Sequence, residues 1–574
     1  MTDIRRTILW VIFTFSMLML WDQWQIHQGR APTFGLAAPP RTAAPAATPD
    51  PALPSAAPAP ARSAEVPPAS ALPTAAAPAS VPSASTGKPS AGERIVVSTD
   101  VLRLTFDTEG GSLVRAELTQ HAAMEDRRAT MVLLDDSPQR VYVAQTGVIG
   151  APAGSAFPNH KTVMRVDGAR ELRDGQNELV LRFESPVQGG LKLVKTWTLR
   201  RGAYDMAVRH ELVNMSDQPL SPQVYLQILR DGSKPPGESA FHYTFTGPAV
   251  YTDAKKFQKI DFSDIEKSRA EHERTADNGW VAMVQHYFAS AWLLASGQTR
   301  ELFTRKVGPN LYAAGMVVPL GNLAPGASRS LDSTFFAGPQ VEKMLERLAP
   351  GFELVKDYGW FTILAKPLYW LLAKLHDWIG NWGWAIVALV FLLKAAFYWL
   401  NAKAYQSMAK MKAIGPRIME LRDRYKDKPQ QMQQEMMRIY REEKVNPMGG
   451  CFPILIQIPV FIALYWVLLS SVEMRNAPWI LWVTDLAAPD PYYVLPLVMT
   501  LTTLLQTALN PVPPDPLQAK LMWFMPLAFS VMFFLFPAGL VLYWLTNNVL
   551  SIAQQWVINT RMGVPPQFNL PKFG

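Results

Sequence analysis

The chain has 574 residues, of which 49% are hydrophobic and 18% are charged, and its formal net charge is +8 at pH 7. This length would accommodate about four domains of average size, but residues 521–560 contain no aspartate, glutamate, lysine, arginine or histidine. Because about 20 apolar residues already span a bilayer, the composition excludes a purely soluble protein. The single cysteine, Cys451, excludes an internal disulfide framework and a cysteine-based zinc cluster.

An uncharged segment follows Arg6 near the start of the chain. Residues 7–21 are typical of either a signal peptide or a short membrane anchor. Trp24 extends the apolar character and suits a membrane interface, so we favour an uncleaved transmembrane anchor over 1–28 with a cytoplasmic N-terminus.

Residues 29–94 are expected to form a linker. The stretch 31–92 holds 21 alanines and 15 prolines, and proline at this density blocks helices and sheets and leaves an extended tether. A ligand for proline-binding modules is the alternative, but no repeated basic PxxP pattern is present. The linker is therefore interpreted as a plain spacer.

From Ile95 onward, apolar and polar residues alternate, as in the run from Leu102 to Phe106. Many short runs of this kind, separated by turn residues, predict an antiparallel β-sandwich domain over 95–350. It follows the first span, so we place it outside the cytoplasmic membrane. Its histidines lack metal-ligand spacing, and a carbohydrate-binding role is not specified by any residue. The histidines considered are His242, His272 and His286.

The segment 351–379 mixes aromatic and aliphatic residues with charged ones. The charges would cover about half of a helical circumference, as in an interfacial amphipathic helix lying on a membrane. A helix packed on the sandwich would show the same pattern. We favour the membrane surface because an apolar segment follows at once. The charged residues are Lys356, Asp357, Lys366, Lys374 and Asp377.

The rest of the chain predicts a polytopic α-helical membrane protein. Transmembrane span 2 covers 380–400, a cytoplasmic helical hairpin covers 401–446, spans 3–6 lie within 447–560, and 561–574 form a short cytoplasmic tail. The hairpin segment carries 11 basic against 6 acidic residues, so the positive-inside rule places it in the cytoplasm. Six spans then put both ends of the chain inside and residues 29–380 outside. The core spans are 382–400, 449–471, 492–509, 521–536 and 539–559.

The hairpin itself is predicted as two helices broken near Pro429, a residue that suits the first turn of a helix. Both helices carry methionines, whose adaptable side chains suit varied partners. The same methionines would equally hold the two helices together. They are Met408, Met411, Met419, Met432, Met436 and Met437.

The five core spans contain no histidine and no carboxylate. Proton relays and cation-coupled carriers normally use such groups inside the membrane, and covalent catalysis needs an activated nucleophile with a base. We therefore expect that the protein is not an enzyme and has no cofactor and no metal.

One cation, Lys394, remains within these spans, together with uncharged polar residues that the predicted orientation places in the cytoplasmic half. Two interpretations stay open. In the first, Lys394 reaches the inner headgroups and the amides bond helix to helix. In the second, the polar faces converge on a hydrophilic groove open to cytoplasm and lipid but sealed outside. The polar residues are Gln457, Gln506, Asn547, Asn548, Ser551, Gln554 and Gln555.

Three motifs resemble the signature of the YidC membrane protein insertases. Residues 446–461 read NPMGGCFPILIQIPVF, residues 536–544 read FPAGLVLYW, and residues 490–493 read DPYY. The similarity covers the five-span core, about 380–560, and the succession of anchor, linker, sandwich and interfacial helix is similar to the Gram-negative, six-span form of the family. The family's groove cation is usually arginine. Lys394 stands at the matching place, which keeps the charge but loses the bidentate fork.

The resemblance implies a membrane insertase and chaperone in the cell inner membrane, with the sandwich as its periplasmic domain. It would insert nascent membrane proteins alone or with the Sec translocon, and its hairpin at 403–444 would meet the ribosome or the signal-recognition targeting machinery. Trp544 stands where close relatives often have a second tyrosine. The implied substrate groove comprises Lys394, Gln457, Gln506, Tyr543, Trp544, Asn547, Ser551 and Gln554.

These features together predict a mechanism in which the hairpin receives a hydrophobic chain and Lys394 and the amides hold its polar tail. The apolar segment then partitions into lipid, driven by apolar transfer and by the membrane potential. A small-solute transporter and a membrane-tethered periplasmic carbohydrate-binding protein remain as alternatives.

Overall fold

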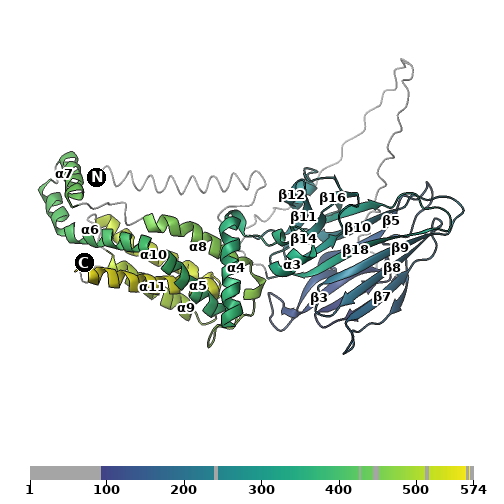
Figure 1. Cartoon of the computed structure of the whole chain (residues 1–574), viewed down its shortest axis with the longest axis horizontal. Helices are drawn as coiled ribbons and strands as arrows, with labels where there is room; N and C mark the ends of the chain where they lie inside the picture. The colour runs from purple at the N-terminus through teal and green to yellow at the C-terminus, as the bar shows by residue number, and fades with distance from the viewer. Residues whose placement is uncertain are drawn as a thin grey trace, which may run out of the picture. The chain divides into compact units, whose positions relative to one another are not determined.

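A computed structural model describes residues 92–237, 244–425, 428–443, 452–510, 516–563 and 568. The chain divides into a β unit that ends at Gly338 and a helical unit that begins at Pro339 (Figure 1). The predicted anchor over 1–28, nearly all of the predicted linker, His242 and Cys451 lie outside the described residues.

The β unit is an antiparallel sandwich, as the alternating sequence predicts. In the described part of the chain it has two nine-stranded sheets, and a short helix, α2 (Phe262–Glu266), interrupts the strand order. The first sheet runs in the order β1 (Arg94–Ser98), β2 (Leu102–Asp107), β3 (Ser112–Ala122), β4 (Thr130–Ser137), β5 (Arg140–Ile149), β10 (Gln223–Asp231), β17 (Leu311–Pro319), β16 (Arg300–Gly308) and β13 (Thr275–Ala276). The second runs in the order β12 (Lys256–Lys259), β11 (Gly247–Thr252), β14 (Trp280–Val284), β15 (Phe288–Leu293), β18 (Ser328–Pro339), β9 (Asp205–Asn214), β8 (Leu191–Arg200), β7 (Glu178–Glu184) and β6 (Arg165–Gly168).

Aromatic side chains fill the space between the two sheets. Phe106 of β2 packs edge-on against Trp197 of β8, with ring centroids 5.1 Å apart, and Trp292 of β15 lies 4.7 Å from Phe335 of β18. All four are essentially inaccessible to solvent. Each large aromatic removes 150–250 Å² from water, so this layer is a main source of the stability of the sandwich.

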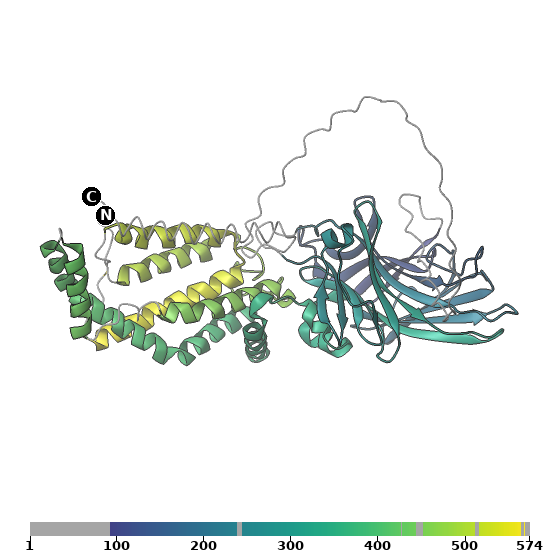
Figure 2. The same ribbon diagram turned by 90° about the horizontal axis from the view of Figure 1, so that it is seen from above.

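The helical unit holds the predicted membrane core and hairpin. Two short helices, α3 (Glu342–Leu348) and the 3-10 turn η1 (Phe352–Val355), lead from the sandwich, and η2 (Gly359–Phe361) precedes the first long helix. The remaining elements are α4 (Thr362–Ile379), α5 (Trp382–Ala396), α6 (Tyr398–Arg424), α7 (Pro429–Glu442), α8 (Phe452–Ser470), η3 (Val472–Met474), α9 (Val494–Leu509), α10 (Pro516–Met532), η4 (Phe533–Leu535) and α11 (Ala538–Arg561). Helices α5, α8, α9, α10 and α11 run side by side, and α4 crosses one end of them (Figures 1 and 2).

Helix α4 differs from the sequence prediction at its beginning. The predicted helix from residue 351 starts only at Thr362, and Lys356, which was expected on a wetted face, is buried and ion-paired with Glu473. One face of α4 packs into the helical core through residues such as Leu372. Trp378 is 81% exposed on the other side, which is consistent with the interfacial placement that stays a prediction.

Two of the motifs quoted above, residues 490–493 and 536–544, form hydrogen bonds in the loop that follows α8. Asp490 is buried and accepts hydrogen bonds from the Trp482 indole and from the backbone N–H of Leu495, so it holds the start of α9. The backbone N–H groups of Ala538 and Gly539 donate to carbonyls of the same loop, at 2.8 and 2.9 Å. The first turn of α11 is thereby tied to this end of the bundle.

The predicted span 380–400 is not one straight helix. Helix α5 ends at Ala396, and α6 departs from it at an angle of 68° after Phe397. Among the described residues, no single helix is both long and apolar enough to cross a membrane alone, although the bent α5–α6 pair meets the criteria together. The number and orientation of the spans therefore remain predictions.

The hairpin consists of α6 and α7, with the break before Pro429 that the sequence indicates. A small apolar cluster joins the two helices and consists of Ile414, Ile418 and Ile439, with Met411 and Met436 packed against them. These methionines hold the hairpin together, whereas Met419 and Met437 are exposed. Met408 and Met432 are half-buried, so Met419 and Met437 are the methionines most accessible to a partner.

Candidate functional site

The site is centred on Lys394 in the last turn of α5. Its ammonium donates a hydrogen bond to Ser551 Oγ of α11, at 2.7 Å. No ion pair to this ammonium is found within the described residues. A lysine ammonium has three N–H donors, so two of them remain available to another group.

A small cavity adjoins the Lys394 side chain. The volume of this cavity is about 20 Å³, which is enough for about one water molecule. Polar side chains enter it from three helices, and its walls are otherwise apolar. The lining residues are Val390, Leu393, Lys394, Phe397, Gln457, Val460, Tyr543 and Asn547.

The structure therefore brings together five of the eight groove residues named from the sequence: Lys394, Gln457, Tyr543, Asn547 and Ser551. They come from α5, α8 and α11. A stripe at i and i+4 on α11 places Asn547 and Ser551 on the face toward α5. This grouping is what the groove interpretation requires.

The other three predicted groove residues do not line the cavity. The Gln554 amide donates to the backbone carbonyl of Tyr398 at 3.4 Å, and its buried Oε1 has no hydrogen-bond partner. Trp544 packs edge-on against Phe461, 4.7 Å between centroids, in an aromatic layer beyond the cavity. Gln506, on α9, does not line the cavity.

Two further polar residues of α11 face away from Lys394. Asn548 is buried and donates to Thr503 Oγ1 at 2.8 Å, and Gln555 is buried and donates to the backbone of Leu509 at 3.4 Å. Both partners belong to α9. For these two amides the interhelical-bond interpretation is correct, and the groove interpretation of the face toward Lys394 stays a prediction.

Sequence reasoning missed two polar residues on α6. Asn401 is buried with an unpartnered Nδ2, and Tyr405 lies one turn later on the same helix, where it is half-buried. Residues at i and i+4 share a helix face. The spacing of four residues between Asn401 and Tyr405 indicates a shared polar face, but the helix was interpreted only as part of the hairpin.

A second polar cluster lies where α4 crosses the ends of the bundle helices. Lys356 Nζ is 3.4 Å from Glu473 Oε2, and the Tyr369 hydroxyl donates to the other oxygen of this carboxylate at 2.5 Å. The Tyr358 hydroxyl donates to Glu342 at 2.6 Å. Burial lowers the pKa of Lys356, and the nearby carboxylates oppose this effect. Each of these groups has a partner, so the cluster is a structural clamp and not a binding site.

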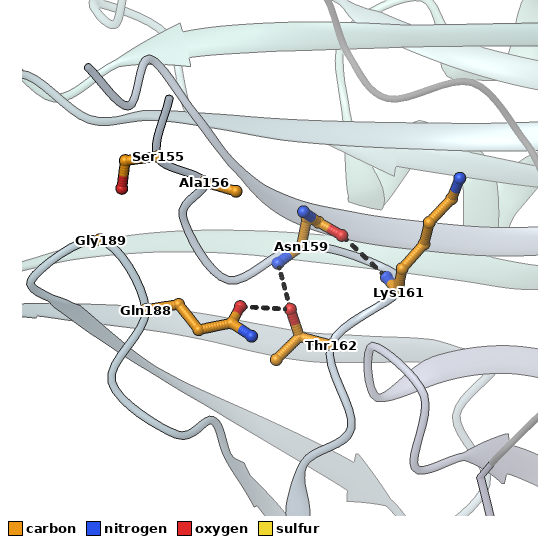
Figure 3. Close-up of a pocket in the computed structure, with 7 residues that line it drawn as sticks. All are labelled: Ser155, Ala156, Asn159, Lys161, Thr162, Gln188 and Gly189. Atoms are coloured by element: carbon orange, nitrogen blue, oxygen red, sulfur yellow. Dashed lines mark hydrogen bonds between the residues drawn. The ribbon is translucent and has the colours of Figure 1, made fainter. Parts of the chain in front are cut away.

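The sandwich has a hollow of its own, of about 390 Å³, shown in Figure 3. Its polar groups bond mainly to one another: Thr162 donates to Gln188 at 2.8 Å, and Asn159 Oδ1 accepts the backbone N–H of Lys161 at 2.9 Å. The Lys161 side chain points away from Ser155 (Figure 3). The hollow lacks a convergent set of free donors, and it gives no support to the carbohydrate-binding alternative.

The described residues contain no group of three or more histidine, cysteine, aspartate or glutamate side chains that could hold a metal ion. His272 contacts a backbone carbonyl and Thr304, and His286 stacks on Tyr287. These histidines have ordinary packing roles.

Two family models and several relatives of nearly full length match this chain. A family model described as the YidC periplasmic domain matches residues 94–371, and one described as the 60Kd inner membrane protein matches residues 374–564. A membrane protein insertase YidC from Janthinobacterium sp. (strain Marseille) is 50% identical over 577 residues, covering 98% of this chain and 100% of that protein. One from Bordetella petrii is 54% identical over 561 residues, covering 98% of each. A crystal structure of an active YidC insertase is similar with a TM-score of 0.38 and 20% identity, over 80% of this chain and 91% of that chain.

Proposed function

Because this chain belongs to the YidC family of membrane protein insertases, we propose that it inserts nascent membrane proteins into the inner membrane through the groove around Lys394. The curated relatives are named insertases, in agreement with the expectation that the chain is not an enzyme. The sandwich corresponds to the family's periplasmic domain.

The observation that carries this proposal is the uneven distribution of polarity along the bundle. Near the last turn of α5, Lys394 has two N–H donors to spare and adjoins a cavity lined by Gln457 and Asn547. Toward the first turn of α11, aromatic rings such as Trp544 and Phe461 close the same space. A groove that is polar at one end and sealed at the other cannot conduct, but it shortens the apolar distance that a polar segment has to cross.

Insertion then proceeds in three steps. The hairpin α6–α7 receives the hydrophobic segment near the membrane. Lys394 and the groove amides bind its short polar tail, and an acidic tail binds best because a charge-assisted hydrogen bond is roughly twice as strong as a neutral one. The apolar segment then partitions into lipid, and the membrane potential assists the outward transfer of acidic residues.

The same proposal includes the topology and the partners. The chain crosses the membrane six times with both ends in the cytoplasm, and the hairpin meets ribosomes or the targeting machinery. The Sec translocon cooperates on some substrates. The basic excess of residues 401–446 supports this orientation.

The test uses two substrates that differ only in whether the external tail carries two aspartates or two asparagines. Lys394→Glu should reduce insertion of the acidic tail by about ten-fold, equivalent to ~1.4 kcal/mol, and Lys394→Arg should retain it. Lys374→Glu is the matched control, since Lys374 is exposed on α4. Insertion is read from protease protection of the tail in inverted vesicles. Normal insertion of the acidic tail by Lys394→Glu would refute the role of the cation.

A further inference from the structure

The loop between α8 and α9 contains a turn, residues 478–483, that displays an exposed leucine. Leu481 has a backbone φ of 52°, and its side chain is 82% exposed among the described residues. The left-handed region is costly for residues other than glycine, asparagine and aspartate, and a leucine that lies in water recovers none of this cost by packing. No charged residue occurs between Arg475 and Asp485. The turn therefore combines an unfavourable backbone, an apolar tip and an uncharged neighbourhood.

Hydrogen bonds from two directions hold this turn in place. The backbone N–H of Trp479 donates to the carbonyl of Val483 at 2.9 Å, which closes the turn. From the N-cap of α5, Asn381 Nδ2 donates to the carbonyls of Pro478 and Trp479 at 3.0 and 3.3 Å. The oxygen of the same side chain accepts a backbone N–H of α5 and caps this helix. Leu481 is thus presented by a backbone that is tied to the start of α5.

Other apolar side chains are exposed at the same end of the bundle. Trp479 packs edge-on against Trp384 of α5, with ring centroids 5.5 Å apart, and the hydrogen bond from Trp482 to Asp490 joins the turn to the start of α9. Tryptophan and tyrosine are enriched where a membrane meets water. The exposed apolar and aromatic residues around the turn are Trp378, Ile379, Trp384, Ile480, Tyr492 and Tyr493. Leu481 therefore continues a surface whose composition matches a membrane interface.

We infer that the 478–483 turn inserts into the outer leaflet of the bilayer and anchors the outer end of the bundle through Ile480 and Leu481. The inference rests on the proposed six-span topology, in which the loop between α8 and α9 is external, and it adds a lipid contact to that topology. Phospholipid is the partner that fits, because its acyl chains accept apolar side chains, whereas Arg475 and Asp485 at the two limits of the uncharged segment suit the headgroups. A loop that topology alone places in water is then a membrane anchor.

The experiment uses the full-length chain in a Cys451→Ser background, reconstituted alone in vesicles of phosphatidylethanolamine and phosphatidylglycerol. Leu481→Cys carries an environment-sensitive fluorophore, and two quenchers are compared: a phospholipid with a spin label near the start of its acyl chain, and aqueous iodide. Met215→Cys is the matched control, because Met215 is an apolar residue of the sandwich and is 58% exposed. The spin-labelled lipid should quench the label on Leu481→Cys and not the label on Met215→Cys, and iodide should show the reverse order.

A second variant tests whether Leu481 itself holds the turn in lipid. Leu481→Asp suits the positive φ but places a charge at the tip. For a label on Ile480→Cys, this change should reduce lipid quenching about ten-fold, because moving a leucine side chain from water into hydrocarbon favours the inserted state by at least this factor. Unchanged quenching would overturn the inference, since the turn would then not depend on its apolar tip.

The outcomes separate this inference from the proposed function. Thr484 is exposed three residues after Leu481, and Thr484→Cys should react with a membrane-impermeant thiol reagent added outside spheroplasts. If it reacts only after the membrane is opened, the proposed topology fails and this inference fails with it. If it reacts from outside but iodide quenches the Leu481→Cys label as strongly as the Met215→Cys label, the topology stands and the inference is wrong. The latter is also the result expected for a turn that binds another protein, because the vesicles contain only this chain. Neither result changes the test of Lys394→Glu, which measures the groove.

Discussion

The clamp around Lys356 predicts a large energetic coupling. This ammonium is fully buried, whereas the Glu473 side chain that it faces at 3.4 Å retains 15% of its exposure. Removing one partner of a buried ion pair typically costs 3–5 kcal/mol, because the other charge is left without compensation. Glu473→Gln preserves the shape of the side chain and removes the carboxylate that is ion-paired with the lysine, while Glu342 remains nearby. We expect the lower end of that range, about 3 kcal/mol, since the carboxylate side is partly wetted.

Removing both charges should cost far less. In the double variant Lys356→Met, Glu473→Gln no buried charge remains unpaired, and such replacements are often close to neutral. We expect a loss of about 1 kcal/mol, which is about 2 kcal/mol less than the loss in Glu473→Gln alone. The pair Lys366–Glu353 gives a matched control, because its charged atoms are also 3.4 Å apart but the lysine is more exposed. Glu353→Gln should cost less than about 1 kcal/mol.

The free energy of unfolding is measured on the full chain in mild detergent by titration with a denaturing detergent. Circular dichroism at the helical minimum follows the helical unit, because the other unit is built from strands. Equal losses in Glu473→Gln and in the double variant would refute the reasoning, since the stranded lysine would then carry no cost. A loss in Glu353→Gln as large as that in Glu473→Gln would refute it as well, because burial would not matter.

Two further predictions concern other parts of the molecule. Burial lowers the pKa of Lys195 in the sandwich from 10.5 to about 7, so the folded state binds this proton less readily than the unfolded state. The resulting destabilisation is complete below pH 7 and disappears as the pH rises toward 10.5. The melting temperature of Lys195→Met relative to the parent should therefore be most favourable at pH 6 and less so by pH 9.5, and a pH-independent difference would contradict this. In a Cys451→Ser background, Gln457→Cys should react with a water-soluble thiol reagent added from the cytoplasm, whereas Leu542→Cys should not, because thiolate forms only where water reaches. Equal protection of both cysteines would exclude a wet groove.

The sandwich could be predicted because its signal is local. Alternation along a strand directly reports which side chains face the core, and the run from Leu102 to Phe106 has its apolar residues buried and Arg103 exposed, as expected. The position of Lys394 could be predicted for a similar reason, since an isolated cation among apolar residues is visible without knowledge of its neighbours. Patterns with a period of two to four residues need no tertiary contact to be interpreted.

The contacts of the clamp could not be predicted in this way. Lys356 and Glu473 are 117 residues apart, and Tyr369 and Glu473 are 104 apart. A charge pattern within one segment shows only that Lys356 could lie on a polar face, and it contains no information about a carboxylate that arrives from another loop. The prediction of a wetted lysine was wrong because the tertiary partner overrides the local pattern.

The polar stripe of α11 shows an intermediate case. Asn547 and Asn548 are neighbours in sequence, so they point about 100° apart around the helix, and the sequence cannot tell which of them faces a cavity and which faces another helix. The neighbours decide this: α9 offers Thr503 to Asn548, whereas the face of Asn547 meets Lys394. A satisfied amide holds two helices together, and an amide beside a free ammonium can bind something else.

Under the proposed function, the direction of transport follows from the contrast between the two ends of the bundle. Where α4 crosses it, the buried charges of Lys356 and Glu473 compensate each other, so an entering anion would have to displace a partner at a cost of several kcal/mol. Near the last turn of α5, the Lys394 ammonium has a neutral hydroxyl as its partner, and among the described residues no carboxylate pairs with it. An acidic tail is therefore attracted at one end only, and release at the other end must be driven by the burial of the attached apolar segment in lipid and by the membrane potential. The proposed groove would then need no chemical fuel of its own, because the substrate supplies the apolar surface that completes the transfer.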